Sequence, residues 1–397
     1  MQSQIKKQDI LIMINRTIFS IGKPIIANLA IAFFVLISLN SKANDTTLVT
    51  EPATEIAPET THNTAHADEA EKPFDPTEVI FEHISDAHEW HLWGDHHNPV
   101  SIPLPVILYS DKGLEFFMSR EFHHGSAIYK GKNNYKLFKA NNKIKIVNEL
   151  GEVDEEQSAK LIDISITQHV ASMLLGVLII FWIFLSVAST YKNRGISTPK
   201  GLQSFVEPLI VFVRDDIARP NIGPKAEKFL PFLLTIFFFI WVNNLLGLIP
   251  SGANFTGNIS VTLVLATVTL IVTNVNGNKD YWKHILLPPV PWWLYPIMIP
   301  VEIIGVISKP FALMIRLFAN ITAGHIIIIS LISLIFIFKT IAISPVSIAF
   351  GLFMDVLELL VAFLQAYIFT MLTALFIGTA VAEHEHDHSH DNEHAHH

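Results

Sequence analysis

The chain has 397 residues, of which 50% are hydrophobic and only 16% are charged, and its formal net charge is −9. This balance favours a multi-span membrane protein over a soluble globule, and without a large basic patch a nucleic-acid interface is excluded. Cysteine is absent, which excludes disulfides and thiolate metal sites.

The first segment is typical of an export signal. Four basic residues precede an apolar run at 25–39, and Ser41-Lys42-Ala43 fits a cleavage site after Ala43. Residues 1–43 are therefore predicted to be a signal peptide, with an uncleaved anchor as the alternative and Met13 as an alternative start. Either way, Asn44 and the residues after it are expected to face away from the cytoplasm.

Residues 44–73 are rich in Thr, Ala, Glu and Pro and lack an apolar period, so they are predicted to form a disordered linker. Residues 74–98 are predicted to form one acidic, histidine-rich helix. Its histidines suit zinc or copper, but His88-Glu89-Trp90-His91 does not have the H-E-x-x-H spacing of a zinc protease. We therefore interpret this helix as a solvated acidic one that holds no metal.

Short β-prone runs lie between 101 and 148, separated by the turn sequences Asp111-Lys112-Gly113, His124-Gly125 and Asn141-Asn142. Such spacing predicts the hairpins of a small β-rich unit. An acidic helical lead into the membrane is expected from Glu149 to Lys160. Residues 74–160 are thus predicted to be a periplasmic α+β extension.

Residues 161–383 are predicted to be the membrane domain. Its apolar spans are expected at about 169–190, 229–249, 259–275, 297–338 and 345–382. The last two exceed the ~20 residues that a span needs, so they must tilt or bend strongly.

Basic residues orient these spans. Lys192, Arg194 and Lys200 follow the first span and place its end in the cytoplasm. Residues 202–219 are too charged to span and suit an interfacial helix. The C-terminus is then cytoplasmic, and residues 384–397, where histidine alternates with acid, are predicted to be a disordered tail. The predicted fold is an all-α polytopic membrane protein with about five membrane helices, an interfacial helix and a small β-rich extramembrane domain.

Arg316 is a charged residue within the longest apolar stretch of the chain. A charge near the centre of a membrane helix costs about 2.5–3.5 kcal/mol on insertion scales; the alternative is an arginine that snorkels to the interface. Glu302, Lys309 and Arg316 are spaced by seven, a step that drifts only ~20° around a helix, so they share one face. Asn320 lies one turn beyond Arg316, whereas His325 falls on the opposite side.

The next long helix carries Glu358 and Gln365, which also share a face. Arginine does not release its proton, so Arg316 attracts carboxylates and blocks a route. His325 and Glu358 exchange protons and would couple their titrations, while polar amides orient water. Together they indicate two half-routes separated by a fixed positive charge. For Asn320 and Gln365 alone, hydrogen bonding between helices is the competing explanation.

Several motifs resemble the signature of subunit a of the F-type ATP synthase membrane sector. They are Ser308-Lys309-Pro310, Arg316-Leu317-Phe318-Ala319-Asn320, Ala323-Gly324-His325, Glu358 and Leu364-Gln365-Ala366-Tyr367-Ile368-Phe369. The resemblance covers about residues 165–383. It implies tilted helices beside a rotating ring of c subunits that each bear one carboxylate, with b-subunit stator helices, the F1 sector and membrane lipid as further partners, in a bacterial inner membrane.

The resemblance also implies roles for individual residues. Arg316 matches the family's essential arginine. His325, Glu358, Asn320 and Gln365 would line the route from the outer face, and Glu302 and Ser308 the route to the cytoplasm. Some family members have an acid at the position of His325 and a histidine at that of Glu358, so the pair is exchanged here. The chain departs from members that carry an acid in the second span, because it has Asn244-Leu245-Leu246-Gly247 there.

Two rival functions explain less of the sequence. A secondary cation/proton antiporter would show internal inverted repeats and broken helices in both halves, and the sequence has neither. An envelope metal-binding or assembly protein would leave Arg316, Glu358 and Gln365 unexplained. No G-x-x-x-x-G-K-[ST] motif occurs, so ATP chemistry is expected on partner chains, with no catalytic site and no cofactor on this one.

Overall fold

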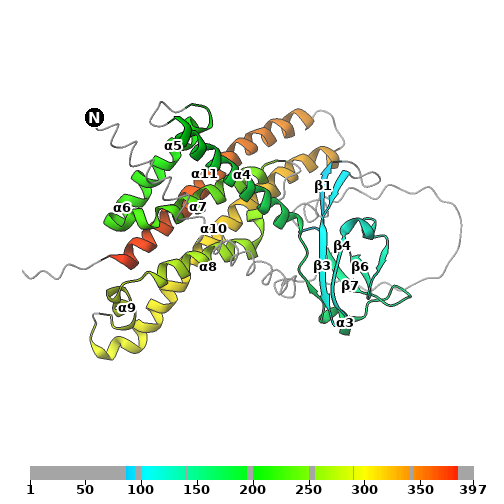
Figure 1. Cartoon of the computed structure of the whole chain (residues 1–397), viewed down its shortest axis with the longest axis horizontal. Helices are drawn as coiled ribbons and strands as arrows, with labels where there is room; N and C mark the ends of the chain where they lie inside the picture. The colour runs from blue at the N-terminus through cyan, green and yellow to red at the C-terminus, as the bar shows by residue number, and fades with distance from the viewer. Residues whose placement is uncertain are drawn as a thin grey trace, which may run out of the picture. The chain divides into compact units, whose positions relative to one another are not determined.

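The computed structural model describes residues 86–93, 100–138, 142–194, 200–249, 255–288, 290–338 and 343–382 (Figure 1). The predicted signal peptide, linker and C-terminal tail lie outside these residues. The described chain divides into two compact units, one of residues 86–168 with 323–357 and one of residues 169–322 with 358–382. The long helices α10 (Tyr295–Phe338) and α11 (Ser344–Val381) contribute to both.

The extension consists of three antiparallel sheets, with strand orders β1-β2, β4-β3-β8 and β5-β6-β7. Its elements in chain order are β1 (Glu89–Trp93), β2 (Val100–Pro103), β3 (Pro105–Ser110), β4 (Gly113–Met118), the 3-10 turn η1 (Ser119–Phe122), β5 (Ile128–Lys130), β6 (Asn134–Phe138), β7 (Lys143–Ile146), α3 (Glu155–Ala159) and β8 (Ile162–Asp163).

The core of the extension lies between its two three-stranded sheets. Alternate side chains of β3, β4, β6 and β7 point into it, as expected for strands with one buried face. Its buried members are Val106, Leu108, Phe117, Phe122, Tyr135, Leu137, Ile144 and Ile146. The predicted β3–β4 hairpin is confirmed, and Gly113 with φ +102° closes its turn because glycine adopts positive φ without a steric penalty.

Two helix predictions for the extension are wrong where the structure describes them. Residues 89–93 form strand β1, in which Trp90 pairs with Ile102 of the next strand, β2, so cross-strand pairing overrides the helical preference. The acidic lead is helical only over α3, where Asp154 caps the helix by accepting from the Gln157 N–H at 3.0 Å. Gly151, with φ +85°, makes a turn before it.

The second unit is helical. Its elements are α4 (Gln168–Arg194), α5 (Leu202–Phe212), the π-helical turn η2 (Val213–Ala218), α6 (Arg219–Ile222), η3 (Gly223–Lys225), α7 (Ala226–Gly247), η4 (Phe255–Gly257), α8 (Ile259–Val275), α9 (Lys279–Leu286), η5 (Trp292–Leu294) and parts of α10 and α11. Among the described residues, four helical stretches are long and apolar enough to cross a membrane, or five if α8 and α9, bent by 106°, form one span. The predicted polytopic fold with about five membrane helices is confirmed.

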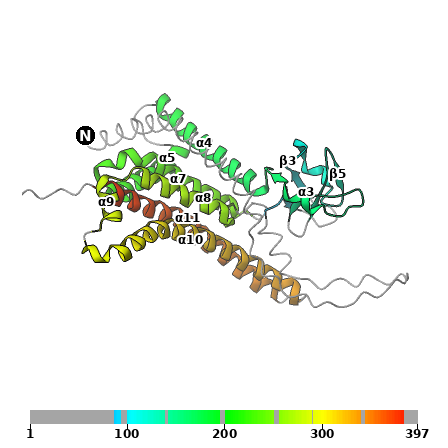
Figure 2. The same ribbon diagram turned by 90° about the horizontal axis from the view of Figure 1, so that it is seen from below.

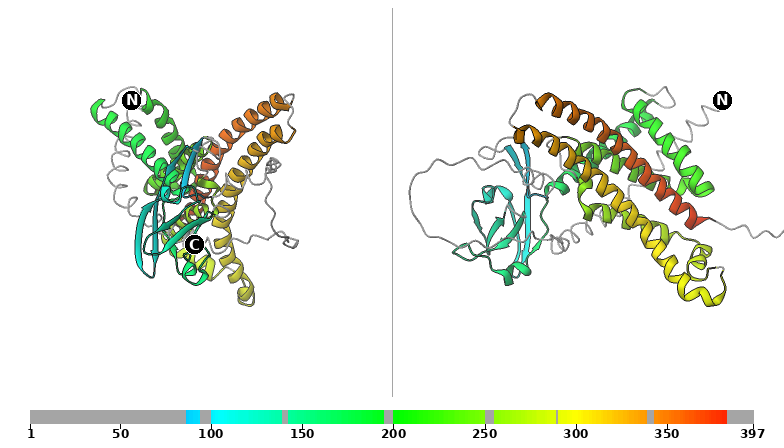
Figure 3. Two further views of the ribbon diagram at one scale, coloured as in Figure 1. Left: turned by 90° about the vertical axis from the view of Figure 1, so that its right-hand side faces the viewer. Right: turned by 180° about the vertical axis from the view of Figure 1, so that it is seen from behind.

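Helix α7 forms the centre of the membrane core. Leu230, Leu233, Phe237 and Ile240 are fully or almost fully buried along it. Aromatic rings join α7 to α11, since the ring centroids of Phe237 and Phe363 are 5.9 Å apart at 88°. Helices α10 and α11 run antiparallel beside each other (Figures 2 and 3).

The C-terminal end of α11 is held by polar groups from two other segments. Lys225 donates from Nζ to the Val381 carbonyl at 3.2 Å, and Asn278 donates from its backbone N–H to the Ala380 carbonyl at 2.9 Å. The last carbonyls of a helix have no partner within the helix. These donors therefore replace water at the end of α11.

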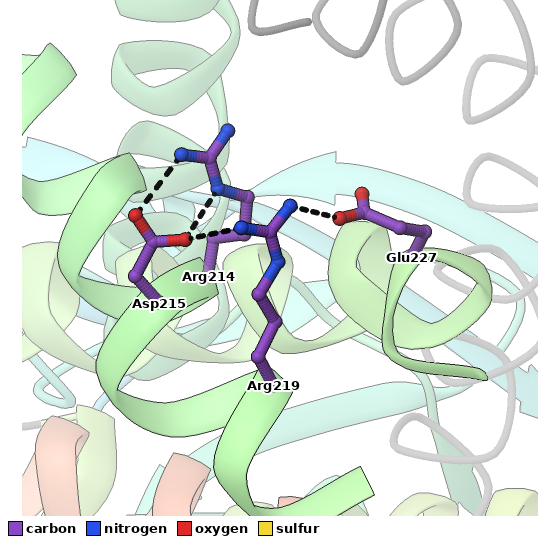
Figure 4. Close-up of polar contacts among 4 residues, drawn as sticks. All are labelled: Arg214, Asp215, Arg219 and Glu227. Atoms are coloured by element: carbon purple, nitrogen blue, oxygen red, sulfur yellow. Dashed lines mark hydrogen bonds and ion pairs between the residues drawn. The ribbon is translucent and has the colours of Figure 1, made fainter. Parts of the chain in front are cut away.

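A cluster of charges joins η2, α6 and α7 (Figure 4). Arg214, only 2% exposed, binds both carboxylate oxygens of Asp215, with Nε at 2.8 Å and Nη2 at 3.0 Å. Arg219 donates from Nη1 to Oδ1 of Asp215 at 2.9 Å and from Nη2 to Oε1 of Glu227 at 2.8 Å, which links the two carboxylates. The carboxylate of Asp215 thus accepts from two guanidinium groups, which is how a buried arginine is tolerated.

Candidate functional site

Arg316 lies on the outward side of α10. Leu313, Leu317 and Ile321, at helical spacing, are 1–3% exposed and pack into the membrane core, whereas Arg316 and Asn320 are exposed. Within the described residues, no carboxylate of the chain forms an ion pair with Arg316. Its side chain is therefore presented on the outward side of a candidate membrane helix.

The other polar residues of α10 have different surroundings. Glu302 is half-buried, and Ser308 is exposed with its hydroxyl donating to the Gly305 carbonyl at 3.0 Å, within its own helix. Lys309 extends toward α11, with Nζ 5.5 Å from the centre of the Phe376 ring. His325 is half-buried and belongs to the other compact unit, so its predicted pairing with Glu358 stays a prediction.

Glu358 and Gln365 lie on the inward face of α11. Each side chain is 4% exposed, and Ala362 and Ala366 between and after them are fully buried. Small residues at these positions let neighbouring helices approach closely. The face predicted from the seven-residue spacing is thus a buried one, which a carboxyl group in a membrane occupies only where function or pairing requires it.

An amide of α7 reaches this face of α11. Asn244, 3% exposed, donates from Nδ2 to the Ala362 carbonyl at 3.3 Å, and its Oδ1 accepts from the Thr256 hydroxyl at 2.8 Å. A polar chain therefore connects η4, α7 and the segment of α11 between Glu358 and Gln365. In the sequence, Asn244 stands out only as a departure from an acidic position, and no pattern singles out Thr256. The signal that points to Asn244 is the pair Asn243-Asn244 in an otherwise apolar span.

A second polar space lies between α8, α9, α10 and α11. It is a cavity of about 20 Å³, enough for a single water, lined by hydroxyl, amide and ammonium groups together with apolar side chains. The polar lining residues are Thr269, Thr273, Asn274, Tyr281, Lys309 and Thr379. Thr273 is buried, and in the described part of the chain its hydroxyl has no hydrogen-bond partner. Buried water is typically held by such unsatisfied groups.

His88 of the extension is an internal ion-pair partner. Its Nε2 lies 2.8 Å from Oδ2 of Asp163, and the side chain is 5% exposed. Burial favours the neutral imidazole, but the hydrogen bond and the negative charge of Asp163 outweigh it, so the pKa of His88 is raised. Burial likewise opposes the charged form of Asp163, yet the hydrogen bond and charge of His88 lower the pKa of its carboxyl group.

The described residues contain no group of three or more histidine or acidic side chains placed to hold a metal ion. Of the histidines considered for metal binding, His88 is paired with Asp163 and His91 is exposed on β1. His83, His96 and His97 lie outside the described residues.

The family model described as "ATP synthase A chain" matches residues 170–378. The match runs from the first turn of α4 almost to the end of α11 and includes every predicted site residue. The chain belongs to this family. A second model, described as a domain of unknown function (DUF8433), matches residues 79–164, which include the strands of the extension.

Several proteins named ATP synthase subunit a are similar to the chain. The "ATP synthase subunit a" of Chloroherpeton thalassium is 52% identical over 226 residues, which cover 56% of this chain and 68% of that protein. The "ATP synthase subunit a 2" of Chlorobaculum tepidum is 51% identical over 228 residues, covering 56% and 64%. The "ATP synthase subunit a" of Myxococcus xanthus is 44% identical over 227 residues, covering 56% and 74%.

Proposed function

We propose that this member of the ATP synthase A chain family is the proton-channel stator subunit of a rotary F-type ATP synthase. Arg316 carries the proposal, because it presents a charge outward from a membrane helix and has no ion pair within the described chain. A ring of c subunits, each with one membrane carboxylate, supplies the partner that such a charge requires. The stator b subunits and the F1 sector, on which ATP chemistry takes place, complete the assembly.

Arg316 acts as a barrier between two half-channels. Its guanidinium stays protonated at physiological pH, so it holds the ring carboxylate ionised as that group passes but does not relay protons. Protons therefore travel around the ring between the two half-channels. This rotation couples proton flow to ATP synthesis.

The outer half-channel uses the inward face of α11. Glu358 exchanges protons, Gln365 and Asn320 orient water, and His325 is the second titratable group of the route. The polar chain of Thr256 and Asn244 lies beside Glu358 and Gln365 through its bond to Ala362. Glu302 and Ser308 line the inner half-channel, toward the cytoplasm. The extension then lies in the periplasm, and the C-terminus lies in the cytoplasm.

The test is Arg316→Ala in inverted membrane vesicles that contain the complete complex. ATP-driven proton pumping, measured as the quenching of a pH-sensitive dye, should fall to background. Lys283→Ala is the matched control, because it removes an exposed cation from α9 and should leave pumping intact. Pumping with normal coupling in the Arg316→Ala vesicles would refute the proposed function.

A further inference from the structure

The β4-β3-β8 sheet has one face in the core of the extension and a second face that is exposed. In β3, Val106 and Leu108 are fully buried, whereas Tyr109 is 50% exposed. In β4, the exposed alternate positions are Leu114, Phe116 and Met118, at 57%, 65% and 39%. Antiparallel sheets with one buried face usually present polar side chains on the other. This sheet presents apolar ones on both.

The third strand extends this apolar face over residues 162–166. Beyond β8, the Ile164 N–H donates to the Ile107 carbonyl at 2.9 Å and the Ile166 N–H to the Pro105 carbonyl at 3.1 Å. The pairing thus continues to Ile166, and Ile162, Ile164 and Ile166 fall on one face. In the register of the sheet, this is the face of Tyr109 and Ile107, because Tyr109 pairs with Ile162.

The polar residues of the same strand point the other way. Asp163 pairs with the buried His88 at 2.8 Å, and the Ser165 hydroxyl accepts from the Ile107 N–H at 3.1 Å. The pattern is therefore the reverse of a sheet that faces water, with charge turned inward and isoleucine outward. An exposed apolar patch of this kind marks an interaction surface.

The chain itself indicates what covers this face. Helix α4, a candidate membrane span, begins at Gln168, only two residues after Ile166. Two extended residues reach about 7 Å, so the end of the sheet is tethered at the membrane boundary. A sheet with open edges does not enter the hydrocarbon, where its unpaired backbone groups would be unsatisfied, but apolar side chains enter the interfacial layer, which also favours tyrosine.

We propose that the apolar face of the β4-β3-β8 sheet lies on the outer leaflet of the lipid bilayer and attaches the extension to the membrane surface. This contact is independent of the proton route. It gives the extension a second attachment besides α4.

The absence of cysteine from the chain allows a direct test with single spin labels. The full chain is reconstituted in vesicles of phosphatidylethanolamine and phosphatidylglycerol, labelled at Leu114→Cys or Phe116→Cys. Lys130→Cys is the control, because Lys130 is exposed on β5 of the opposite sheet. Collision with oxygen, which partitions into lipid, is compared with collision with a water-soluble nickel chelate.

For labels at 114 and 116, the ratio of oxygen to nickel accessibility should exceed that at 130 several-fold. Nickel accessibility equal to that at 130 would place the face in water and overturn the proposal. Protection from both reagents would show that protein covers the face, whether a second copy or another subunit, and would also overturn it. Two labelled positions keep the test decisive if one substitution impairs folding.

Discussion

Asn244 of α7 donates to the Ala362 carbonyl of α11 at 3.3 Å, between the buried residues Glu358 and Gln365. Its Oδ1 accepts from the Thr256 hydroxyl at 2.8 Å. One amide therefore fixes the distance between two membrane helices and orients a loop hydroxyl toward the same place. Because neither partner of Asn244 is charged, this arrangement positions the proposed route without adding a titratable group to it.

Asn244→Ala should weaken both the packing and the proton route. Loss of the two hydrogen bonds should cost about 1–2 kcal/mol of stability and slow ATP-driven pumping without uncoupling it, since Arg316 is unchanged. Thermal unfolding in detergent and the rate of dye quenching in vesicles measure the two effects. Thr267→Ala is the control, because the Thr267 hydroxyl is exposed and bonds only within α8, to the Leu263 carbonyl. Equal effects of Asn244→Ala and Thr267→Ala would contradict a role of Asn244 in helix packing and in the proton route.

Gly378 of α11 should not tolerate alanine. A Cβ at this position would overlap the backbone carbonyl oxygen of Asn221, and backbone atoms cannot rotate away as a side chain does. Gly378→Ala should therefore separate α6 from α11 and lower the yield of folded chain and its unfolding temperature. Gly351→Ala should be neutral or slightly stabilising, because in the described part of the chain its Cβ would meet no atom within 4 Å beyond its neighbours and its own helix backbone, and alanine favours helix by up to about 1 kcal/mol. An equal loss of yield and unfolding temperature in both variants would argue against the close packing of Gly378 on Asn221.

The sequence was informative where the signal was local. The turn at Asp111-Lys112-Gly113 predicted the β3–β4 hairpin, and unbroken apolar runs predicted the membrane helices. The helix predicted over 74–98 was wrong at β1, because that segment pairs with the next strand, β2. The helical preference of a single segment does not report cross-strand pairing.

The same limit applies to the site. Seven-residue spacing places Glu358 and Gln365 on one face, and the structure shows that this face is buried. The contact of Asn244 with Ala362 could not be predicted, because its acceptor is a backbone carbonyl that every residue carries. The need for glycine at 378 likewise depends on Asn221 of a different element.

Removal of Asp215 should destabilise the membrane core strongly. Asp215→Ala leaves Arg214 buried without its bidentate partner, and an uncompensated buried charge costs about 3–5 kcal/mol. Arg219→Ala removes a more exposed partner of Asp215: Arg219 is 49% exposed, so this control should cost at most about 1 kcal/mol. Tryptophan fluorescence during thermal unfolding compares the two. Similar unfolding temperatures would show that Arg214 does not depend on Asp215.

The extension should be most stable in mildly acidic solution. The raised pKa of His88 means that its pairing stabilises the fold fully below its ordinary pKa of 6.5, and that this contribution is lost as pH rises through the raised value. The lowered pKa of Asp163 has the opposite sign, because its contribution is present above the ordinary 3.8 and is lost as pH falls through the lowered value. Between these limits the ion pair is intact.

Digestion of the full chain by trypsin in detergent tests this ion pair. The His88→Gln variant, which lacks the ion pair, should be cleaved in the extension faster than the native chain at pH 6, and this difference should shrink at pH 8.5. Because trypsin itself depends on pH, the ratio of variant to native cleavage rate is the quantity to measure. A ratio that is equal at the two pH values would show that His88 and Asp163 do not stabilise the extension as an ion pair.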